Sequence, residues 1–320
     1  MKRLHGGASD PSLLDFSANV NPLGIPDRVR AVLADGASRV ERYPTPDARE
    51  FAAEVARRHG IPVRCVLPGN GSSDLIYLIA RLFAGRPGRV IVPAFTEYED
   101  ACLASGIDLG ETAPEVTFLG NPSSPEGRLL SQEEVLRWEG TRVVDEAFMD
   151  FVGDRESLLR RAAEDPRLMV LRTLTKFYAI PGLRLGYLVA VPETISKLRL
   201  LQPPWSVNAL AEAAGLAALE EEEYAEFSRR FVRERREELS KELTLSGLEP
   251  LPSVTNYILC RVADAAYLCA ELQKRGIVAR NCDSFTGLEK NRYVRFAVRK
   301  RSENERLIAA LKGICDQCPA

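Results

Sequence analysis

The sequence predicts an α/β protein, with a three-layer large domain built on a mostly parallel sheet and a smaller α+β domain. Three observations predict this class. Short apolar segments alternate with helical patterns between residues 65 and 191, which is typical of a parallel sheet with helices on both faces. A long, charged helical stretch then interrupts the alternation. Finally, 320 residues leave room for about two domains of ordinary size.

The first half of the chain is predicted as an arm followed by alternating helices and strands. Gly, Asn and Pro residues make residues 1–25 irregular, so we expect an arm there. Helical patterns cover 26–35 and 47–59. A short strand at 65–67 leads through a Gly-rich turn into a helix whose N-cap we expect at Ser72 or Ser73. Further strands are predicted at 89–92, 116–119, 142–145, 168–174 and 185–191, with helices at 98–105 and 157–163.

The second half is predicted to contain a long helical stretch and a small α+β unit. Residues 206–243 are helical and heavily charged, and Tyr224, Phe227 and Phe231 are expected to form one buried stripe. Strands at 257–261 and 293–298 and helices at 265–275 and 303–313 follow. We therefore expect an arm at 1–25, a large domain at 26–215 and a small domain at 216–320, which the N-terminal segment completes.

Charge balance and cysteines exclude several classes of protein. Lys and Arg number 43 against 45 Asp and Glu, so the net charge of −2 disfavours a nucleic-acid binder but allows a local cationic pocket. No apolar run approaches the ~20 residues of a membrane-spanning helix, and none follows the basic N-terminus as in a secretory signal. Seven dispersed cysteines, with a CxxC at Cys315 and Cys318, indicate free thiols in the cytoplasm and no metal site.

A carboxylate and a lysine follow two apolar strands. Asp145 ends the strand predicted at 142–145, and Lys176 comes just after the strand at 168–174. Their separation is about that of a β-α-β unit, so the two strands could be neighbours with both side chains at one edge, where α/β sheets bind ligands. Such a pair suits pyridoxal phosphate, with the lysine as Schiff base and the acid on the ring nitrogen. A surface lysine and an ordinary buried salt bridge are the alternatives.

The segment GNGSSDLI offers a place for a phosphate. It follows a strand and opens a helix, so the backbone N–H groups of Gly71, Ser72 and Ser73 can point at an anion. Asp74 stands where a dinucleotide fingerprint needs its third glycine, and no GK[ST] of a P-loop follows. Arg184, eight residues after Lys176, could supply a cationic contact to the same phosphate.

Several motifs make the chain resemble a known family. They are HGG at 5–7, LLDFSANVNPLG at 13–24, ERYP at 41–44, LPGNG at 67–71, PAFTEY at 93–98, DEAFMDF at 145–151, LTKFYAIPGLRLGY at 174–187 and PWSVNALA at 204–211. Over nearly its whole length the chain resembles fold-type I pyridoxal-phosphate enzymes of the aspartate and histidinol-phosphate aminotransferase group. Within that group, the HGG arm, the PWSVNALA run and two late arginines are most similar to the threonine-phosphate decarboxylases of cobalamin biosynthesis.

The resemblance implies roles for individual residues. Lys176 would be the Schiff-base lysine, Asp145 the partner of the ring nitrogen and Arg184 a phosphate ligand. Tyr43 would reach the cofactor phosphate of a neighbouring subunit, which implies a homodimer. The cofactor-binding set would be Tyr43, Gly71, Ser72, Ser73, Phe95, Tyr98, Ser124, Asp145, Phe148, Thr173, Thr175, Lys176 and Arg184, with either Phe95 or Tyr98 stacked on the ring. The substrate-binding set would be His5, Gly6, Asn19, Ser124, Arg280 and Arg295.

The chain also departs from this family pattern. NPSSPEG at 121–127 stands where the group usually has NPNNPTG, so the Asn that would donate to the cofactor's phenolic oxygen is Ser124. Phe148 stands where tyrosine is common in the aminotransferases. The chain is shorter than the family norm between 106 and 117 and again before 145.

The resemblance implies decarboxylation of L-threonine O-3-phosphate to an aminopropanol phosphate. An aminotransferase of the histidinol-phosphate type is the first alternative, because the two kinds of site are nearly the same. A catalytically idle relative that binds or regulates is the second, and Ser124 and the trimmed segments are its only support.

Overall fold

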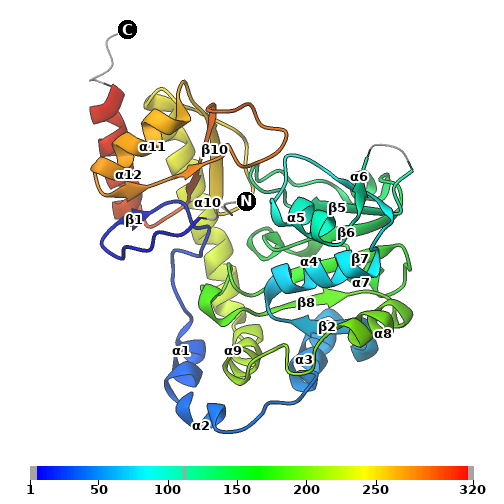
Figure 1. Ribbon diagram of the computed structural model, residues 1–320. Coiled ribbons are helices and arrows are strands. Elements are labelled where there is room, and N and C mark those ends of the chain that lie inside the picture. Colours follow the sequence, from blue (N-terminus) through cyan, green and yellow to red (C-terminus); the bar gives the residue numbers. More distant parts are fainter. Residues whose placement is uncertain (1–5, 111–112, 316–320) are drawn as a thin grey trace.

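The computed structural model describes residues 6–110 and 113–315, and a seven-stranded sheet forms the larger of its two layered regions (Figure 1). The strands lie in the order β2-β8-β7-β6-β5-β3-β4. Strand β8 pairs antiparallel with both neighbours, and the other pairs are parallel. Their bounds are β2 Val66–Gly69, β3 Pro87–Val90, β4 Asp108–Leu109, β5 Val116–Gly120, β6 Thr141–Asp145, β7 Leu168–Thr173 and β8 Gly186–Val189. The mostly parallel sheet predicted from the sequence is confirmed.

Helices cover both faces of this sheet because neighbouring strand residues point to opposite sides. Val143 packs in one apolar core with residues of helices α4, α5 and α8, whereas Val144 packs in another with α3, α7 and α9. The helices in and around the large sheet are α1 Asp27–Ala34, α2 Ala37–Val40, α3 Arg49–His59, α4 Gly71–Leu82, α5 Glu97–Ala104, α6 Gln132–Leu136, α7 Leu159–Ala162, α8 Pro192–Leu201 and α9 Ala209–Leu219. Helices on both faces leave the strands' carboxyl ends as the edge open to a ligand.

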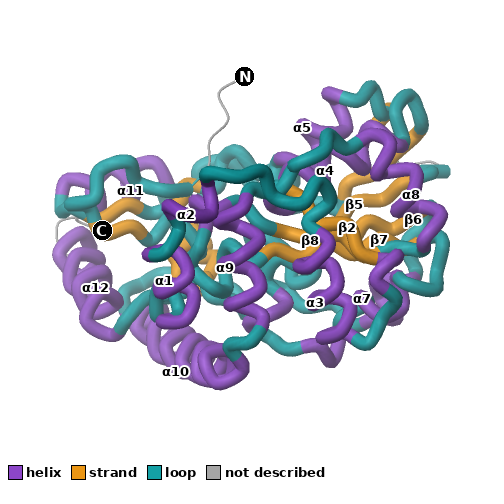
Figure 2. The backbone as a smooth tube through the Cα atoms, turned by 90° about the horizontal axis from the view of Figure 1, so that it is seen from below, coloured by secondary structure: helices purple, strands orange, loops and turns teal. Residues whose placement is uncertain are grey.

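A smaller region lies at the other end of the molecule (Figure 2). Its four strands have the order β12-β13-β10-β9, and β1 of the N-terminal arm pairs with β11 nearby. The bounds are β1 Leu14–Asp15, β9 Glu249–Pro250, β10 Tyr257–Arg261, β11 Ile277–Val278, β12 Arg280–Asn281 and β13 Tyr293–Ala297, with helices α10 Glu222–Leu245, α11 Ala265–Lys274 and α12 Arg301–Cys315. Helix α10 joins the two regions, since Val232 packs in a core of the large sheet and Leu239 in the small one.

Two local expectations need correction. Phe227 is 45% exposed, because the side chains that α10 buries repeat at residues 225, 228, 232, 239 and 243 on another face. Helix α4 begins at Gly71 with Asn70 at the N-cap, so Ser72 and Ser73 lie inside its first turn. Among the described residues, no helix is long and apolar enough to cross a membrane.

Candidate active site

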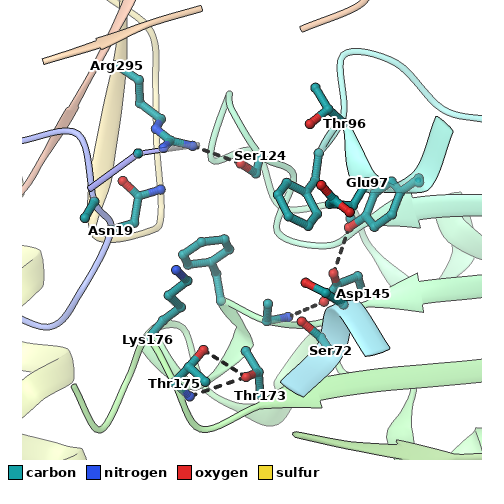
Figure 3. A pocket seen from close by; sticks show the side chains of 18 of the residues that line it. Asn19, Ser72, Thr96, Glu97, Ser124, Asp145, Thr173, Thr175, Lys176 and Arg295 are labelled. Atoms are coloured by element: carbon teal, nitrogen blue, oxygen red, sulfur yellow. Dashed lines mark hydrogen bonds between the residues drawn. The ribbon is translucent and has the colours of Figure 1, made fainter. Parts of the chain in front are cut away.

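A pocket of about 310 Å³ opens at the carboxyl edge of the large sheet, between the two regions (Figure 3). Its walls come from the N-terminal arm, the starts of α4 and α5, the loops after β5, β6 and β7, and the small region. Four basic side chains line it, Lys176, Arg184, Arg280 and Arg295, against the two acidic ones of Glu97 and Asp145. The pocket is therefore locally cationic in a chain whose net charge is −2, and it favours an anionic ligand.

Asp145 and Lys176 meet at this edge because their strands are neighbours. Asp145 is the last residue of β6, which pairs in parallel with β7, and Lys176 lies three residues beyond the end of β7. Figure 3 shows both side chains facing the same cavity. The strand pairing expected from the sequence is thus confirmed.

Burial changes the protonation of both groups. It lowers the pKa of Lys176 to about 8, and the positive charges of Arg295 and Arg184 add to this effect. It raises the pKa of Asp145 to about 6, although hydrogen bonds from Tyr98 and Ala147 act in the opposite direction. Near neutral pH, the site therefore holds an amine that deprotonates more easily than an ordinary lysine, beside a buried carboxylate.

The two aromatic candidates for stacking on a ring lie in different positions. Tyr98 is 3% exposed, and its hydroxyl donates a hydrogen bond of 2.9 Å to Oδ2 of Asp145. Phe95 is only partly buried and meets the Tyr98 ring edge-on at 5.8 Å. The hydroxyl of Tyr98 is engaged at the carboxylate, which favours Phe95 as the side chain that stacks on a ligand ring.

The turn before α4 leaves backbone donors for an anion. The side chain of Asn70 makes no capping hydrogen bond to α4, so it leaves the first N–H groups of the helix able to donate to an anion. Ser72, Ser73 and Arg184 line the pocket here. Gly71 has φ +81°, and a Cβ on it would lie 2.5 Å from Nη2 of Arg184. Glycine therefore allows both the turn and the approach of the guanidinium.

Two arginines from the small region enter the pocket side by side. Arg280 of β12 is the register partner of Arg295 of β13, and both are at least nine-tenths buried. Arg295 donates to Oγ of Ser124 at 3.1 Å and to the carbonyl oxygen of Ser17 at 3.2 Å. Burial lowers the pKa of both guanidinium groups, and the charge of Arg295 lowers that of Arg280 further. Like charges opposite each other are unfavourable, so an anion bound by the two guanidinium groups would offset their repulsion.

Aromatic rings support the two arginines. The guanidinium carbon of Arg295 lies 5.1 Å from the Tyr257 ring centroid, and that of Arg280 lies 5.4 Å from the Phe285 ring centroid. Tyr257 in turn donates its hydroxyl to the carbonyl oxygen of Ser123 at 2.6 Å. These contacts restrict the guanidinium planes before any ligand binds.

Ser124 and Phe148 both line the pocket. The Ser124 hydroxyl accepts from Arg295, and the Phe148 ring meets Tyr257 edge-on at 4.9 Å. Phe148 carries no hydroxyl, so it offers a ligand no hydrogen bond at its place in the pocket.

The N-terminal arm is hydrogen-bonded to the backbone at Lys176 and Phe177. The amide N–H of Asn21 donates to the carbonyl oxygen of Lys176 at 2.9 Å, and its side chain donates to the carbonyl oxygen of Phe177 at 2.8 Å. Asn19 and Gly6 line the pocket, and the buried Oδ1 of Asn19 has no hydrogen-bond partner among the described residues. His5 lies outside the described residues.

Thr173 and Thr175 line the pocket beside the lysine, and their hydroxyl oxygens lie 2.9 Å apart. Tyr43 lies elsewhere, 85% exposed, with its ring 5.2 Å from that of Trp205. Three further residues at the site were not predicted from the sequence: Asn21, Ser17 and Phe285. A polar Asn beside a Pro signals a turn, but nothing in the sequence indicated that Asn21 would contact the lysine segment.

The side chains fit the pyridoxal phosphate expected from the sequence. They supply a buried amine, a buried carboxylate, backbone donors with an arginine for a phosphate, and the acceptor of Asn19 that lacks a partner. The two further arginines would then be left for a substrate that carries anions of its own.

Comparison with known proteins agrees with this geometry. A family model of aminotransferases of class I and II matches residues 11–114 and 108–311. The threonine-phosphate decarboxylase of Salmonella typhimurium is 35% identical over 339 aligned positions, which cover 96% of this chain and 93% of that protein. The structure of the histidinol-phosphate aminotransferase from Clostridium acetobutylicum is similar with a TM-score of 0.88 at 28% identity, covering 95% of this chain and 99% of that one.

A solved decarboxylase is similar to the same extent. The L-threonine-O-3-phosphate decarboxylase from Porphyromonas gingivalis gives a TM-score of 0.85 at 28% identity, covering 94% of this chain and 99% of that one. Both kinds of enzyme are thus similar to this chain over nearly its whole length.

Proposed function

Because the chain belongs to the family of class I and II aminotransferases, we propose that it is a pyridoxal-phosphate enzyme that decarboxylates L-threonine O-3-phosphate. The observation that carries this proposal is the pair of buried arginines, Arg280 and Arg295, beside Lys176. A substrate with a carboxylate and a phosphate offers one anion to each. Histidinol phosphate carries only its phosphate, so one buried arginine would lack an anion in the half-reaction with that substrate, which is costly.

When bound, pyridoxal phosphate supplies an electron sink for the charge left on the substrate's Cα. Lys176 provides the amine that attaches the cofactor, and its lowered pKa raises the fraction of the reactive neutral form at neutral pH. Asp145 holds a proton on the ring nitrogen. Ser72, Ser73 and Arg184 hold the phosphate through backbone N–H groups and a guanidinium.

The structure supports an assignment of the two substrate arginines. Arg295 acts directly on the pKa of Lys176, which places its charge near the reacting amine. The α-carboxylate lies on the carbon that carries the amino group, whereas the phosphate lies on an oxygen two bonds further away. We therefore assign the carboxylate to Arg295 and the phosphate to Arg280, whose Nη2 donates to Oγ of Ser284 at 2.8 Å. After carbon dioxide leaves, Lys176 is placed to return a proton to Cα.

Tyr43 supports a homodimer. Its ring is largely exposed, contacts the Trp205 ring and does not line the pocket of its own chain. Leu200, which is close to Trp205 in the sequence, is 89% exposed. In a dimer, Tyr43 would reach the cofactor phosphate of the neighbouring subunit. We also propose a cytoplasmic location, because the five cysteines in the part of the chain that the structure describes are free thiols.

One pair of assays tests the reaction. The purified protein is offered threonine phosphate alone and, separately, histidinol phosphate with 2-oxoglutarate, while released carbon dioxide and transferred amino groups are measured. Carbon dioxide without any added keto acid is expected in the first reaction, and Lys176→Ala serves as the blank. Amino-group transfer in the second reaction with no carbon dioxide in the first would instead support the aminotransferase.

A further inference from the structure

We propose that Tyr98 is a positioning residue that holds Asp145 as an oriented carboxylate and thereby sets how tightly the protein captures its cofactor. This inference rests on the cofactor part of the proposed function and is independent of which substrate reacts. It gives Tyr98 a task different from stacking on the cofactor ring, and it follows from the hydrogen bond between the Tyr98 hydroxyl and Oδ2 of Asp145.

The surroundings of Tyr98 fix its hydroxyl in place. The residue lies in the first turn of α5, where its N–H donates to the carbonyl oxygen of Phe95, and its ring stacks on Phe118 at 6.2 Å. Gly120, at the end of β5, lies beside the hydroxyl, and a Cβ there would be in contact with the Tyr98 oxygen at 3.4 Å. A buried ring held on several sides loses little freedom when its hydroxyl bonds a carboxylate.

The carboxylate can accept both this bond and a ligand. Oδ2 of Asp145 accepts from Tyr98, and Oδ1 accepts from the N–H of Ala147 at 3.0 Å. A carboxylate has about four acceptor positions, so each oxygen keeps one for the N–H of a pyridine ring. Tyr98 and Ala147 thus fix the plane of the carboxylate from two sides.

The charges around Asp145 show why a donor is needed. Burial raises the pKa of Asp145 to about 6, and the neighbouring carboxylate of Glu146 raises it further. The bonds from Tyr98 and Ala147 and the charge of Lys176 oppose this rise. Tyr257 also lies near enough to interact with Asp145. The pKa of Tyr98 itself is raised well above 10 by its burial, so the hydroxyl stays a donor throughout the neutral range.

The test measures binding of 4-deoxypyridoxine 5′-phosphate, a cofactor analogue without the aldehyde, by calorimetry between pH 5 and 8.5. Without the aldehyde, no bond to Lys176 forms. Affinity for the parent should fall as the pH drops through about 6. A hydrogen bond to a charged group corresponds to about one to two pKa units. In Tyr98→Phe, the fall in affinity should therefore begin about one pH unit higher. At pH 5.5 this variant should bind the analogue roughly eightfold more weakly than the parent.

Two further variants isolate the cause. Tyr187→Phe removes another buried tyrosine hydroxyl, which does not line the pocket and lies 3.0 Å from Nε2 of His59. This variant should keep the parent's pH profile. Asp145→Asn should keep only the pH dependence that comes from the second ionisation of the ligand's own phosphate, and adding Tyr98→Phe to it should cause no further shift. Circular dichroism checks that each variant is folded.

Three results would overturn the inference: a parental profile in Tyr98→Phe, a weakening that is equal at every pH, or a shift that persists without the Asp145 carboxylate. Failure of the parent to bind the analogue would overturn the proposed function and this inference together. Parental binding with the pH step but no carbon dioxide from threonine phosphate would overturn only the proposed reaction.

Discussion

Replacing the two buried arginines one at a time should separate the two anions of the substrate. We expect Arg280→Ala to remove the preference for threonine phosphate over plain threonine. Arg295→Ala should instead slow both substrates, because both carry the α-carboxylate. The reason is electrostatic: the charge of Arg295 helps to lower the pKa of the Lys176 amine, and hydrogen bonds to Ser124 and Ser17 hold the guanidinium in place.

The size of these effects follows from burial. Arg280 is 9% exposed and Arg295 is 7% exposed, so an anion bound to either is shielded from water. Removing one partner of a buried, hydrogen-bonded charge pair costs about 2–5 kcal/mol. At about 1.4 kcal/mol for each factor of ten, kcat/KM for threonine phosphate should fall by roughly 30-fold to several thousand-fold in either variant.

The assay is carbon dioxide release from threonine phosphate and from threonine, each at several substrate concentrations. Arg301→Ala is the matched control, since Arg301 pairs with Glu305 on the exposed side of α12, and it should leave both rates unchanged. Equal losses on both substrates in Arg280→Ala would refute the assignment of the phosphate. If Arg295→Ala lowered kcat/KM for threonine phosphate but not for threonine, Arg295 would bind the phosphate and the assignment would be reversed.

Three further predictions concern Lys176 and its surroundings. Lys176→Ala should abolish turnover, whereas Asp145→Ala should still bind cofactor but lose most of its rate, as steady-state assays and absorbance of the bound cofactor would show. Phe148→Tyr and Ser124→Asn should each lower the pH at which the bound cofactor changes colour, because donors to its phenolic oxygen favour the charged form; an unchanged spectrophotometric titration would count against this. Burial lowers the pKa of Lys176 from 10.5 to about 8, so the unfolded chain binds more protons between these values and stability of the apoprotein should rise with pH there. Lys176→Met should accordingly stabilise the apoprotein at pH 7 by at most about 3 kcal/mol before solvent screening, a gain that disappears toward pH 10.5 in urea unfolding.

Local patterns determined much of the fold. The apolar runs that end at Asp145 and Leu174 predicted two neighbouring parallel strands, and the structure confirms the pairing. The buried face of a long charged helix was harder to predict, because periodicity alone does not say which side of the helix packs against the protein. In α10 the aromatic side chain of Phe227 looked like core, yet the helix packs through smaller residues such as Ala225 and Ser228. The division into an arm at 1–25 and domains at 26–215 and 216–320 stays a prediction.

The sequence by itself determined which side chains gather at the site, since Lys176, Asp145, Arg184, Arg280 and Arg295 all line one pocket. Strand ends predicted the positions of Asp145 and Lys176, and Arg184 was placed by its spacing from the lysine. The family resemblance supplied Arg280 and Arg295, which lie within two strands of the small region. Only the tertiary structure decided how these groups contact others far away in the chain. That Tyr98 donates to Asp145 and Asn21 to the Lys176 backbone depends on how separate elements pack. Hydrogen bonds between residues 47 or 155 positions apart leave no periodic signal in a sequence, because packing rather than spacing brings the atoms together.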